Sequence, residues 1–268
     1  MQSGLKPIAT WSFAPFLQGA RLGGYNRYDL LVFIILAERA IESFRYIDKP
    51  IIYTDSIGEV CFSSFDCDVV NCYDDAHDDV DVRLWAYTKI LTYKKQVQPY
   101  LHFDLDFILK REIDIPECDV FVQCKDTYHQ TFTNDLQSTG LDLPSEFNDT
   151  LLDNSWTVGI LGMFDMDLNE KYTSMAQDYF VMNSKNADNW RDTTMSNTIL
   201  EQQMLALHTI DKDVKCLSNS ECFDNDDFKH YVSHTKKSRF ACHFFHNQVK
   251  QRHYDILRKV QDAIHSRN

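Results

Sequence analysis

Two acids, Asp104 and Asp106, interrupt an apolar run that extends from Tyr100 to Leu109. An extended strand places residues i and i+2 on one face, so both carboxylates are expected to point the same way. Two like charges at the end of a buried strand repel each other and lose hydration, which is costly without a cation. Carboxylate pairs suit hard divalent cations such as Mg²⁺ or Mn²⁺, often shared with a phosphate. The spacing therefore predicts a metal–diphosphate site at the carboxyl end of a central strand.

The Asp-x-Asp spacing by itself is common in this acidic chain. Its other occurrences are expected to be mostly solvated turns or helix caps, because aspartate favours both. They are Asp66/Asp68, Asp79/Asp81, Asp165/Asp167, Asp211/Asp213 and Asp224/Asp226. The pair at Asp104 and Asp106 differs because it alone lies in a strongly apolar strand context. A purely structural role without a metal is the alternative for this pair.

Composition narrows the class of protein. The chain has 268 residues, of which 44% are hydrophobic, which is enough for one large domain. Its formal net charge of -13 gives no electrostatic reason to bind nucleic acid, so that partner is not expected. No targeting segment is visible, and the longest apolar run, 30–37, is too short to span a bilayer, so we expect a cytoplasmic protein without a transmembrane segment. Eight cysteines without a Cys-x-x-Cys pair favour reduced thiols over zinc.

Hydrophobic periodicity predicts alternating strands and helices, hence an α/β fold with a mixed, mostly parallel central sheet flanked by helices. The predicted strands are 6–13, 49–55, 68–72, 100–109, 119–123 and 156–162, with later strands near 214–217 and 239–245. The predicted helices are 28–44, 56–65, 82–97, 168–183, 196–208 and 249–265, and a surface loop is expected at 131–149. We expect a single domain over 1–268, with a nucleotide-binding half to about residue 125 and an acceptor half over 126–268. Neither the Rossmann fingerprint nor a P-loop is present.

Six short motifs occur in a fixed order along the chain. They are PIIYTDSIG at 50–58, LWAYTKI at 84–90, PYLHFDLDFIL at 99–109, WTVGILG at 156–162, NTILEQQML at 197–205 and YVSHTKKS at 231–238. This ordered set resembles nucleotide-sugar glycosyltransferases of the GT-A fold. More narrowly, it is similar to bacterial and viral proteins classed as capsule or surface-glycan glycosyltransferases. The resemblance covers most of the chain, from about Trp11 to Lys237.

The resemblance implies a metal site. Asp104 and Asp106 would hold Mn²⁺ or Mg²⁺ against the diphosphate of a sugar nucleotide, expected to be a UDP- or GDP-sugar, and the metal would stabilise the charge on the departing diphosphate. His234 is the candidate third ligand, with His243 and His246 in reserve, although no His-x-x-Gly-x-Lys pattern follows it. An ordinary structural histidine is the alternative for His234.

The same resemblance implies roles for further residues. Nucleotide contacts are expected from Trp11, Asp55, Trp85, Lys89, Lys236 and Lys237. Glu201 and Gln202 are the candidate catalytic residues, with Glu201 as a general base or as a group that positions acceptor or donor. Gly159 and Gly162 would let the backbone approach the acceptor or sugar closely. Structural alternatives stand beside these roles: a helix cap for Asp55, core for Trp85, a solvent-facing side chain for Glu201, a basic turn for the late lysines and a tight turn for the glycines.

The sequence therefore predicts a metal-dependent glycosyltransferase that moves a sugar from a nucleoside diphosphate to a hydroxyl of a glycan or similar acceptor. One alternative is a haloacid-dehalogenase-type phosphatase, which also uses Asp-x-Asp with Mg²⁺. In that class Thr or Val normally stands two residues after the second acid, where this chain has Ile108. The other alternative is a catalytically silent protein that binds nucleotide sugars. The sugar, base, acceptor, stereochemical outcome and oligomeric state stay open.

Overall fold

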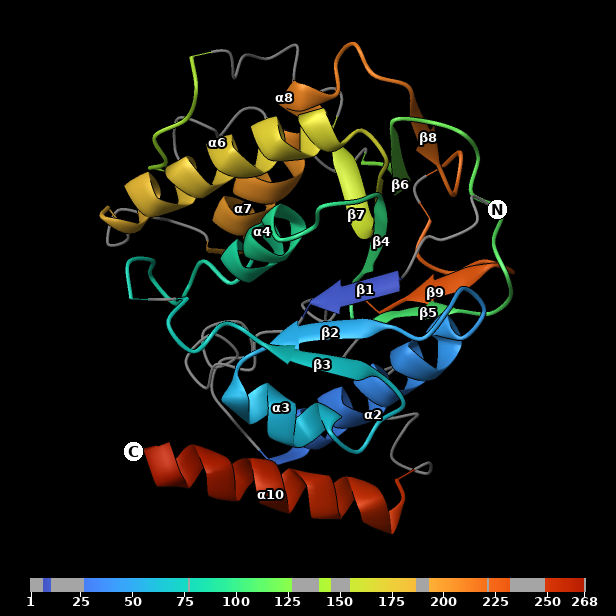
Figure 1. The fold of residues 1–268 in the computed structure, drawn as a ribbon, viewed down its shortest axis with the longest axis vertical. Helices are drawn as coiled ribbons and strands as arrows, with labels where there is room; N and C mark the ends of the chain where they lie inside the picture. The colour runs from blue at the N-terminus through green and yellow to red at the C-terminus, as the bar shows by residue number, and fades with distance from the viewer. Residues whose placement is uncertain are drawn as a thin grey trace. The chain divides into compact units, whose positions relative to one another are not determined.

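The computed structural model shows an α/β protein in which helices accompany mixed sheets (Figure 1). It describes residues 7–10, 27–76, 78–126, 140–145, 155–186, 193–220, 222–231 and 249–267, with no side-chain description for 7–10, 27–29, 193–194 and 267. Every helix in these ranges is too short or too polar to span a membrane.

The strands are β1 Pro7–Thr10, β2 Ile51–Thr54, β3 Asp68–Asn71, β4 Tyr100–Phe103, β5 Phe107–Leu109, β6 Val120–Lys125, β7 Trp156–Met163, β8 Val214–Cys216 and β9 Phe228–His230. The helices are α2 Arg27–Phe44, α3 Ser56–Phe62, α4 Tyr87–Lys94, α6 Met166–Ser184, α7 Thr193–Thr198, α8 Met204–His208 and α10 Gln251–Arg267, and a π-helical segment, η4 Ile199–Gln203, joins α7 to α8. The predicted helices at 28–44, 168–183 and 249–265 are confirmed as α2, α6 and α10.

The chain forms two compact units, each built from segments that are not contiguous in sequence. The described residues of unit 1 lie within Ala76–His102 and Ile115–Cys222. Those of unit 2 lie within Lys6–Asp75, Phe103–Asp114 and Phe223–Asn268. The expected division near residue 125 stays a prediction.

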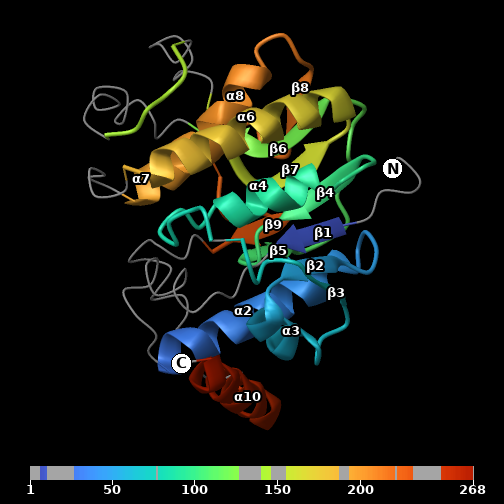
Figure 2. The same ribbon diagram turned by 60° about the vertical axis from the view of Figure 1, so that its left-hand side comes forward.

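Unit 2 contains a parallel sheet and an antiparallel strand pair. β1, β2 and β3 run parallel in the order β3-β2-β1, and β5 pairs antiparallel with β9. α10 lies alongside α3 and α2, an arrangement that Figures 1 and 2 both show. An aromatic series links α2 to the strand pair: Phe44 stacks on Phe103 at 4.5 Å between ring centroids, and Phe107 stacks on Phe228 at 4.9 Å.

A buried charged contact fastens α10 to α2. His253 and Glu38 are both buried, and Nε2 of His253 lies 2.8 Å from Oε2 of Glu38. The backbone N–H of Lys250 donates to Nδ1 of the same ring at 2.9 Å. A nitrogen that accepts this bond carries no proton, so Nε2 carries the proton and donates it towards Glu38. Arg252 pairs with the other carboxylate oxygen of Glu38 at 2.5 Å.

Unit 1 has the strand order β4-β7-β6-β8, with β6 antiparallel to β7 and parallel to β8. α4 packs against α6, and α6 packs against α8. Buried tyrosines and an asparagine join these layers: the hydroxyl of Tyr100 donates to Oδ1 of Asn169 at 3.0 Å, and Nδ2 of Asn169 donates to the carbonyl of Tyr93 at 2.9 Å. A fully satisfied polar network of this kind fixes the relative placement of β4, α4 and α6.

The structure corrects several predicted boundaries. The predicted helix at 82–97 is shorter, because α4 begins at Tyr87 and turns occupy the residues before it. The predicted strand at 100–109 is broken into β4 and β5 by a turn at residues 104–106. α3 ends at Phe62 rather than at Phe65. The predicted strand at 239–245 and most of the predicted loop at 131–149 lie outside the described residues.

Candidate functional site

The turn between β4 and β5 carries the two acids singled out from the sequence. β4 is entirely buried, and the backbone N–H of Phe107 donates to the carbonyl of Asp104 at 2.9 Å. This bond closes the turn, so Asp104 and Asp106 lie at the end of a buried strand as expected, but on a bend instead of within one extended run. The backbone bond across the bend fixes the main-chain positions of both acids and therefore the directions of their side chains.

β9 brings a histidine to this turn from the far end of the sequence. In the antiparallel pair, His230 stands opposite Phe107 and Phe228 stands opposite Leu109. Two backbone bonds fix the end of β9: the N–H of Tyr231 donates to the carbonyl of Asp106 at 2.8 Å, and the N–H of His230 donates to the carbonyl of Phe223 at 2.7 Å. The position of His230 beside the acids is therefore determined by main-chain pairing.

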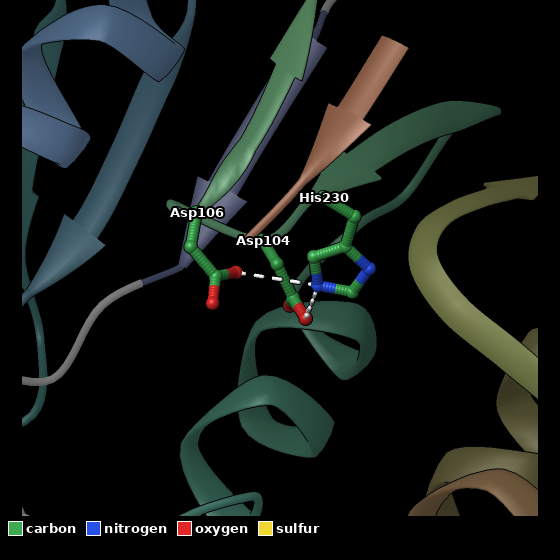
Figure 3. Close-up of side chains that lie close together, drawn as sticks. All are labelled: Asp104, Asp106 and His230. Carbon is green, nitrogen blue, oxygen red and sulfur yellow. Dashed lines mark ion pairs between the residues drawn. The ribbon is translucent and has the colours of Figure 1, made fainter. Parts of the chain in front are cut away.

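The three side chains converge on one point. Nε2 of His230 lies 3.4 Å from Oδ1 of Asp106 and 3.8 Å from Oδ2 of Asp104. Figure 3 shows both carboxylates turned towards the same ring nitrogen. The side chains of Asp104, Asp106 and His230 are only 17%, 10% and 8% exposed, so water screens their charges poorly. All three belong to unit 2.

The arrangement fits a divalent cation. One ligand atom from each of the three residues lies within 4.8 Å of the others. Metal–ligand bonds of about 2.0–2.2 Å place neighbouring ligand atoms roughly 3–4 Å apart, which is close to the observed spacing. Two carboxylate oxygens and one imidazole nitrogen suit Mn²⁺ and related borderline cations and also admit Mg²⁺. Three protein ligands leave further coordination positions for a phosphate or water.

Sequence reasoning missed His230 and named His234. Residues 232–248 lie outside the described residues, so His234, Lys236 and Lys237, with the reserves His243 and His246, stay predictions there, as does Trp11. One sequence signal pointed to residue 230: Phe228 and His230 alternate with Lys229, which places Phe228 and His230 on one face of a short strand. The contact with Asp104 depends on a pairing across more than a hundred residues, which no local pattern encodes.

Glu201 lies in a polar cluster of unit 1. Its side chain is 1% exposed, and Oε1 lies 3.2 Å from Nζ of Lys89 and accepts a hydrogen bond from the hydroxyl of Tyr93 at 3.2 Å. The hydroxyl of Tyr172 donates to the backbone carbonyl of Glu201 at 3.0 Å. The solvent-facing alternative for Glu201 is therefore wrong, because the carboxylate is buried and ion-paired.

Lys89 and Trp85 lie next to each other in the same unit. Nζ of Lys89 is 5.7 Å from the centre of the Trp85 ring, within the range of a cation–π interaction. The side chain of Lys89 is 11% exposed, and Trp85 is half-buried. Gln202 follows Glu201 in η4 and is also half-buried. Among these predicted site residues, the structure brings together Glu201, Lys89 and Trp85, and the role of each in nucleotide or sugar binding stays a prediction.

Asp55 caps a helix. It follows β2 directly, and its Oδ1 accepts hydrogen bonds from the backbone N–H groups of Ile57 and Gly58 at 3.1 and 2.8 Å. These bonds satisfy two of the N–H groups that have no partner within α3. Asp55 is also buried at the carboxyl end of a parallel strand, where ligands of α/β sheets bind. The helix-cap alternative is confirmed, and a nucleotide contact stays a prediction.

The two glycines of β7 occupy different settings. A Cβ at Gly162 would lie 2.9 Å from the ring of Phe164 and 3.0 Å from side-chain atoms of Leu101 and Phe121, so close apolar packing accounts for this glycine. Gly159 falls where the β6–β7 register shifts, between Val122 and Cys124 on the partner strand. Such irregularities bend a strand and often use glycine. Contact of either glycine with a sugar stays a prediction.

Comparison with solved structures gives low-identity likenesses. The chain is similar to the galactosyltransferase LgtC in complex with donor and acceptor sugar analogs, at 9% identity and a TM-score of 0.41 over 79% of this chain and 72% of that one. It is similar to the bifunctional glycosyltransferase WbbM at 10% identity and a TM-score of 0.39, over 69% of this chain and 37% of that one. It is also similar to the inositol-1-phosphate CTP transferase from T. maritima at 11% identity and a TM-score of 0.40, over 97% of this chain and 98% of that one. Likenesses at this level carry no inference about activity.

Comparison with curated proteins gave no match. A family model, described as a family of unknown function (DUF6734), matches residues 26–266. The match covers most of both compact units and includes all three residues of the Asp104–Asp106–His230 cluster. Because the model spans most of the sequence, the chain belongs to the DUF6734 family.

Proposed function

We propose that this protein is a metal-dependent glycosyltransferase that moves a sugar from a nucleoside diphosphate sugar to a hydroxyl group of a glycan or similar acceptor. The observation that carries the proposal is the convergence of Asp104, Asp106 and His230 at the end of a buried strand. The ordered motifs of the sequence, which resemble GT-A glycosyltransferases, support the same activity.

Asp104, Asp106 and His230 would together hold Mn²⁺ or Mg²⁺. The bound metal would supply positive charge to the diphosphate as negative charge builds on it. The net charge of -13 makes such local help necessary, because an anionic ligand is otherwise repelled by the protein. Lys236 and Lys237 are proposed to add cationic contacts to the diphosphate, and His234 is kept as a competing third ligand.

In the proposed reaction, the acceptor oxygen forms a bond to the anomeric carbon while the bond from that carbon to the diphosphate oxygen breaks. The electron pair of the broken bond leaves with the diphosphate, and the proton of the acceptor hydroxyl passes to a base. Glu201 and Gln202 are proposed to bind and position the donor sugar or the acceptor. The burial of Glu201 and its pairing with Lys89 favour a positioning role for Glu201 over direct proton removal.

The test is a thermal-shift panel of nucleoside diphosphates and nucleotide sugars with Mn²⁺, Mg²⁺ or EDTA. A ligand present at a hundred times its Kd stabilises the native state by about 2.7 kcal/mol. For a protein of this size, that stabilisation raises Tm by roughly 5–10 °C. We expect one nucleotide sugar to give such a shift with metal and little shift with EDTA, and turnover to release the matching nucleoside diphosphate.

The variant for this test is the double substitution Asp104→Asn, Asp106→Asn. It should abolish the metal-dependent shift and the turnover while the protein stays folded, because removing two crowded like charges relieves repulsion. The matched control is Asp66→Asn, Asp68→Asn, an exposed pair with the same spacing in the same unit, which should leave both unchanged. Equal losses in the two double variants would contradict the proposed site. Metal-dependent phosphate release from simple phosphomonoesters, without nucleotide-sugar binding, would favour a phosphatase.

A further inference from the structure

The helical run of α7 and η4 meets α4 at two places. Glu201 of η4 contacts the side chains of Lys89 and Tyr93. Four residues earlier in the same run, the fully buried Asn197 contacts the backbone just before α4. Oδ1 of Asn197 accepts the N–H of Ala86 at 2.8 Å, and Nδ2 donates to the carbonyl of Arg83 at 2.9 Å. All of these residues belong to unit 1.

The backbone N–H of Ala86, at the start of α4, is bonded by a side chain from outside the helix. Ala86 is the N-cap residue of α4, and its methyl side chain cannot accept a hydrogen bond. The N–H of Ala86 is one of the groups at a helix start that have no partner within the helix, and Asn197 supplies that partner. The carboxamide of Asn197 offers one acceptor and two donors, which matches an N–H group and a carbonyl side by side. An ionised aspartate has the same shape but no donor, and would direct an oxygen at the carbonyl of Arg83.

The two contacts are coupled because they reach one continuous stretch of chain. Asn197 bonds the backbone of Arg83 and Ala86 just before α4, and Glu201 contacts the side chains of Lys89 and Tyr93 within α4. Asn197 fixes the backbone at the start of α4, and Glu201 receives Lys89 one turn further along. An ion pair at 3.2 Å loses its close contact when the cation moves by about 1 Å, so the contact of Lys89 with Glu201 depends on where α4 begins.

We infer that Asn197 is a positioning residue: it holds the start of α4 so that Lys89 meets Glu201 and lies beside Trp85. The inference rests on the proposed function only for the part that Lys89 and Glu201 then take in binding a substrate. The contact between them is a property of unit 1 that can be measured without any substrate.

The first experiment measures the exposure of Lys89 by competitive acetylation of the full chain, with mass spectrometry of the peptide that contains it. The variants are Asn197→Ala and, as matched control, Asn183→Ala. Asn183 is also fully buried in unit 1 and bonds main-chain groups in the same way, with Oδ1 accepting the N–H of Asp142 at 2.7 Å and Nδ2 donating to its carbonyl at 2.8 Å. We expect acetylation of Lys89 to rise by about tenfold in N197A and to stay unchanged in N183A.

An unchanged rate for Lys89 in folded N197A would overturn the inference, and so would an equal rise in both variants. Where N197A does not fold, the acetylation of Lys89 is measured instead in the variant Asn197→Asp. Burial disfavours the charged form of an aspartate. The protonated acid would regain a donor to the carbonyl of Arg83. The charged side chains on the segments that it contacts and on its own helical run are Arg83, which pairs with Asp81, and Lys89, which pairs with Glu201.

At each pH, the acetylation rate of Lys89 in N197D is divided by the rate in the chain without the substitution. This ratio should therefore fall as the pH is lowered. A ratio that does not change with pH would count against the inference. Kinetics with the nucleotide sugar then add a second readout: Asn197→Ala should lower kcat/KM, while the affinity for Mn²⁺ alone, which depends on Asp104 and Asp106, stays unchanged in isothermal titration. A chain without transferase activity would fail the panel of nucleotide sugars and could still pass the acetylation test, so the two failures are distinguishable.

Discussion

The ring of His230 is held by its surroundings before any ligand arrives. Its centroid lies 5.6 Å from that of Phe107 and 5.8 Å from that of Phe223, and both aromatic rings are tilted relative to it. Aromatic neighbours and the main-chain bonds of β9 restrict the rotation of the imidazole. A ligand that is already oriented loses little conformational entropy when it binds a metal.

At the residue scale, alanine substitution of each candidate histidine tests whether His230, as in the structure, or His234, as the sequence predicted, is the third metal ligand. His230→Ala should weaken Mn²⁺ binding by at least about tenfold, because it removes one of three converging ligand atoms. His234→Ala is the control and should leave the affinity nearly unchanged. Isothermal titration with Mn²⁺ measures both affinities. A loss in H234A with none in H230A would restore the sequence-based ligand and remove His230 from the site.

How much of the site the sequence could reveal depends on the range of each interaction. Asp104 and Asp106 were predictable because two residues of spacing and their apolar neighbours carry the information locally. The helix cap at Asp55 was foreseen as an alternative for the same reason. His230 required the β5–β9 register, and the burial of Glu201 required knowing that α4 and η4 pack together. A periodic pattern shows which face of an element is buried but not which other element packs against that face.

At the scale of elements, η4 shows where the sequence pattern was incomplete. The periodicity predicted one helix over 196–208, and the structure has a helical run over 193–208 whose middle is π-helical. The wider turn changes which residues share a face after Ile199, so Glu201 and Gln203 are buried where an undisturbed helix would present a different set. π-Helical turns occur frequently at functional sites. No residue type announces this widening, so the sequence predicted the element but not its geometry.

The attachment of α10 to α2 leads to a prediction about stability. His253→Leu removes the contact with Glu38 and leaves the N–H of Lys250 without its acceptor. We expect the free energy of unfolding to fall by about 1–3 kcal/mol. The control is Arg258→Ala, which removes an exposed pair with Asp255 at 3.3 Å and should cost no more than about 0.5 kcal/mol. Urea denaturation measures both. Similar losses in the two variants would show that the buried pair adds nothing beyond a surface pair.

Packing around β7 allows a further test of the glycine assignments. Gly162→Ala forces a methyl group against Phe164, Leu101 and Phe121, and should lower the free energy of unfolding by about 1–3 kcal/mol. Binding of the nucleotide sugar, measured at a temperature where the variant is folded, should persist. Loss of that binding at unchanged stability would instead support the predicted contact of Gly162 with the sugar.

At the scale of the whole molecule, the division into two units localises the expected response to metal. Asp104, Asp106 and His230 all lie in unit 2. Metal that binds the native state suppresses local opening of the segments that supply its ligands. Mn²⁺ should therefore slow hydrogen exchange in peptides that cover β5 and β9, and leave those that cover β6 and β8 in unit 1 unchanged. Exchange mass spectrometry with and without Mn²⁺ measures this. Slowed exchange that begins in unit 1 would place the metal elsewhere.

Because the ligands of the candidate metal site are far apart in sequence, they are synthesised at different times. The ribosome synthesises the two aspartates more than a hundred residues before His230. At about 5–20 residues per second, the acidic pair waits on the order of ten seconds for its third partner. A nascent or truncated chain that stops short of β9 would carry the acidic motif without the complete ligand set. Full metal affinity would then report that synthesis has passed β9, which makes it a measure of how far translation has progressed.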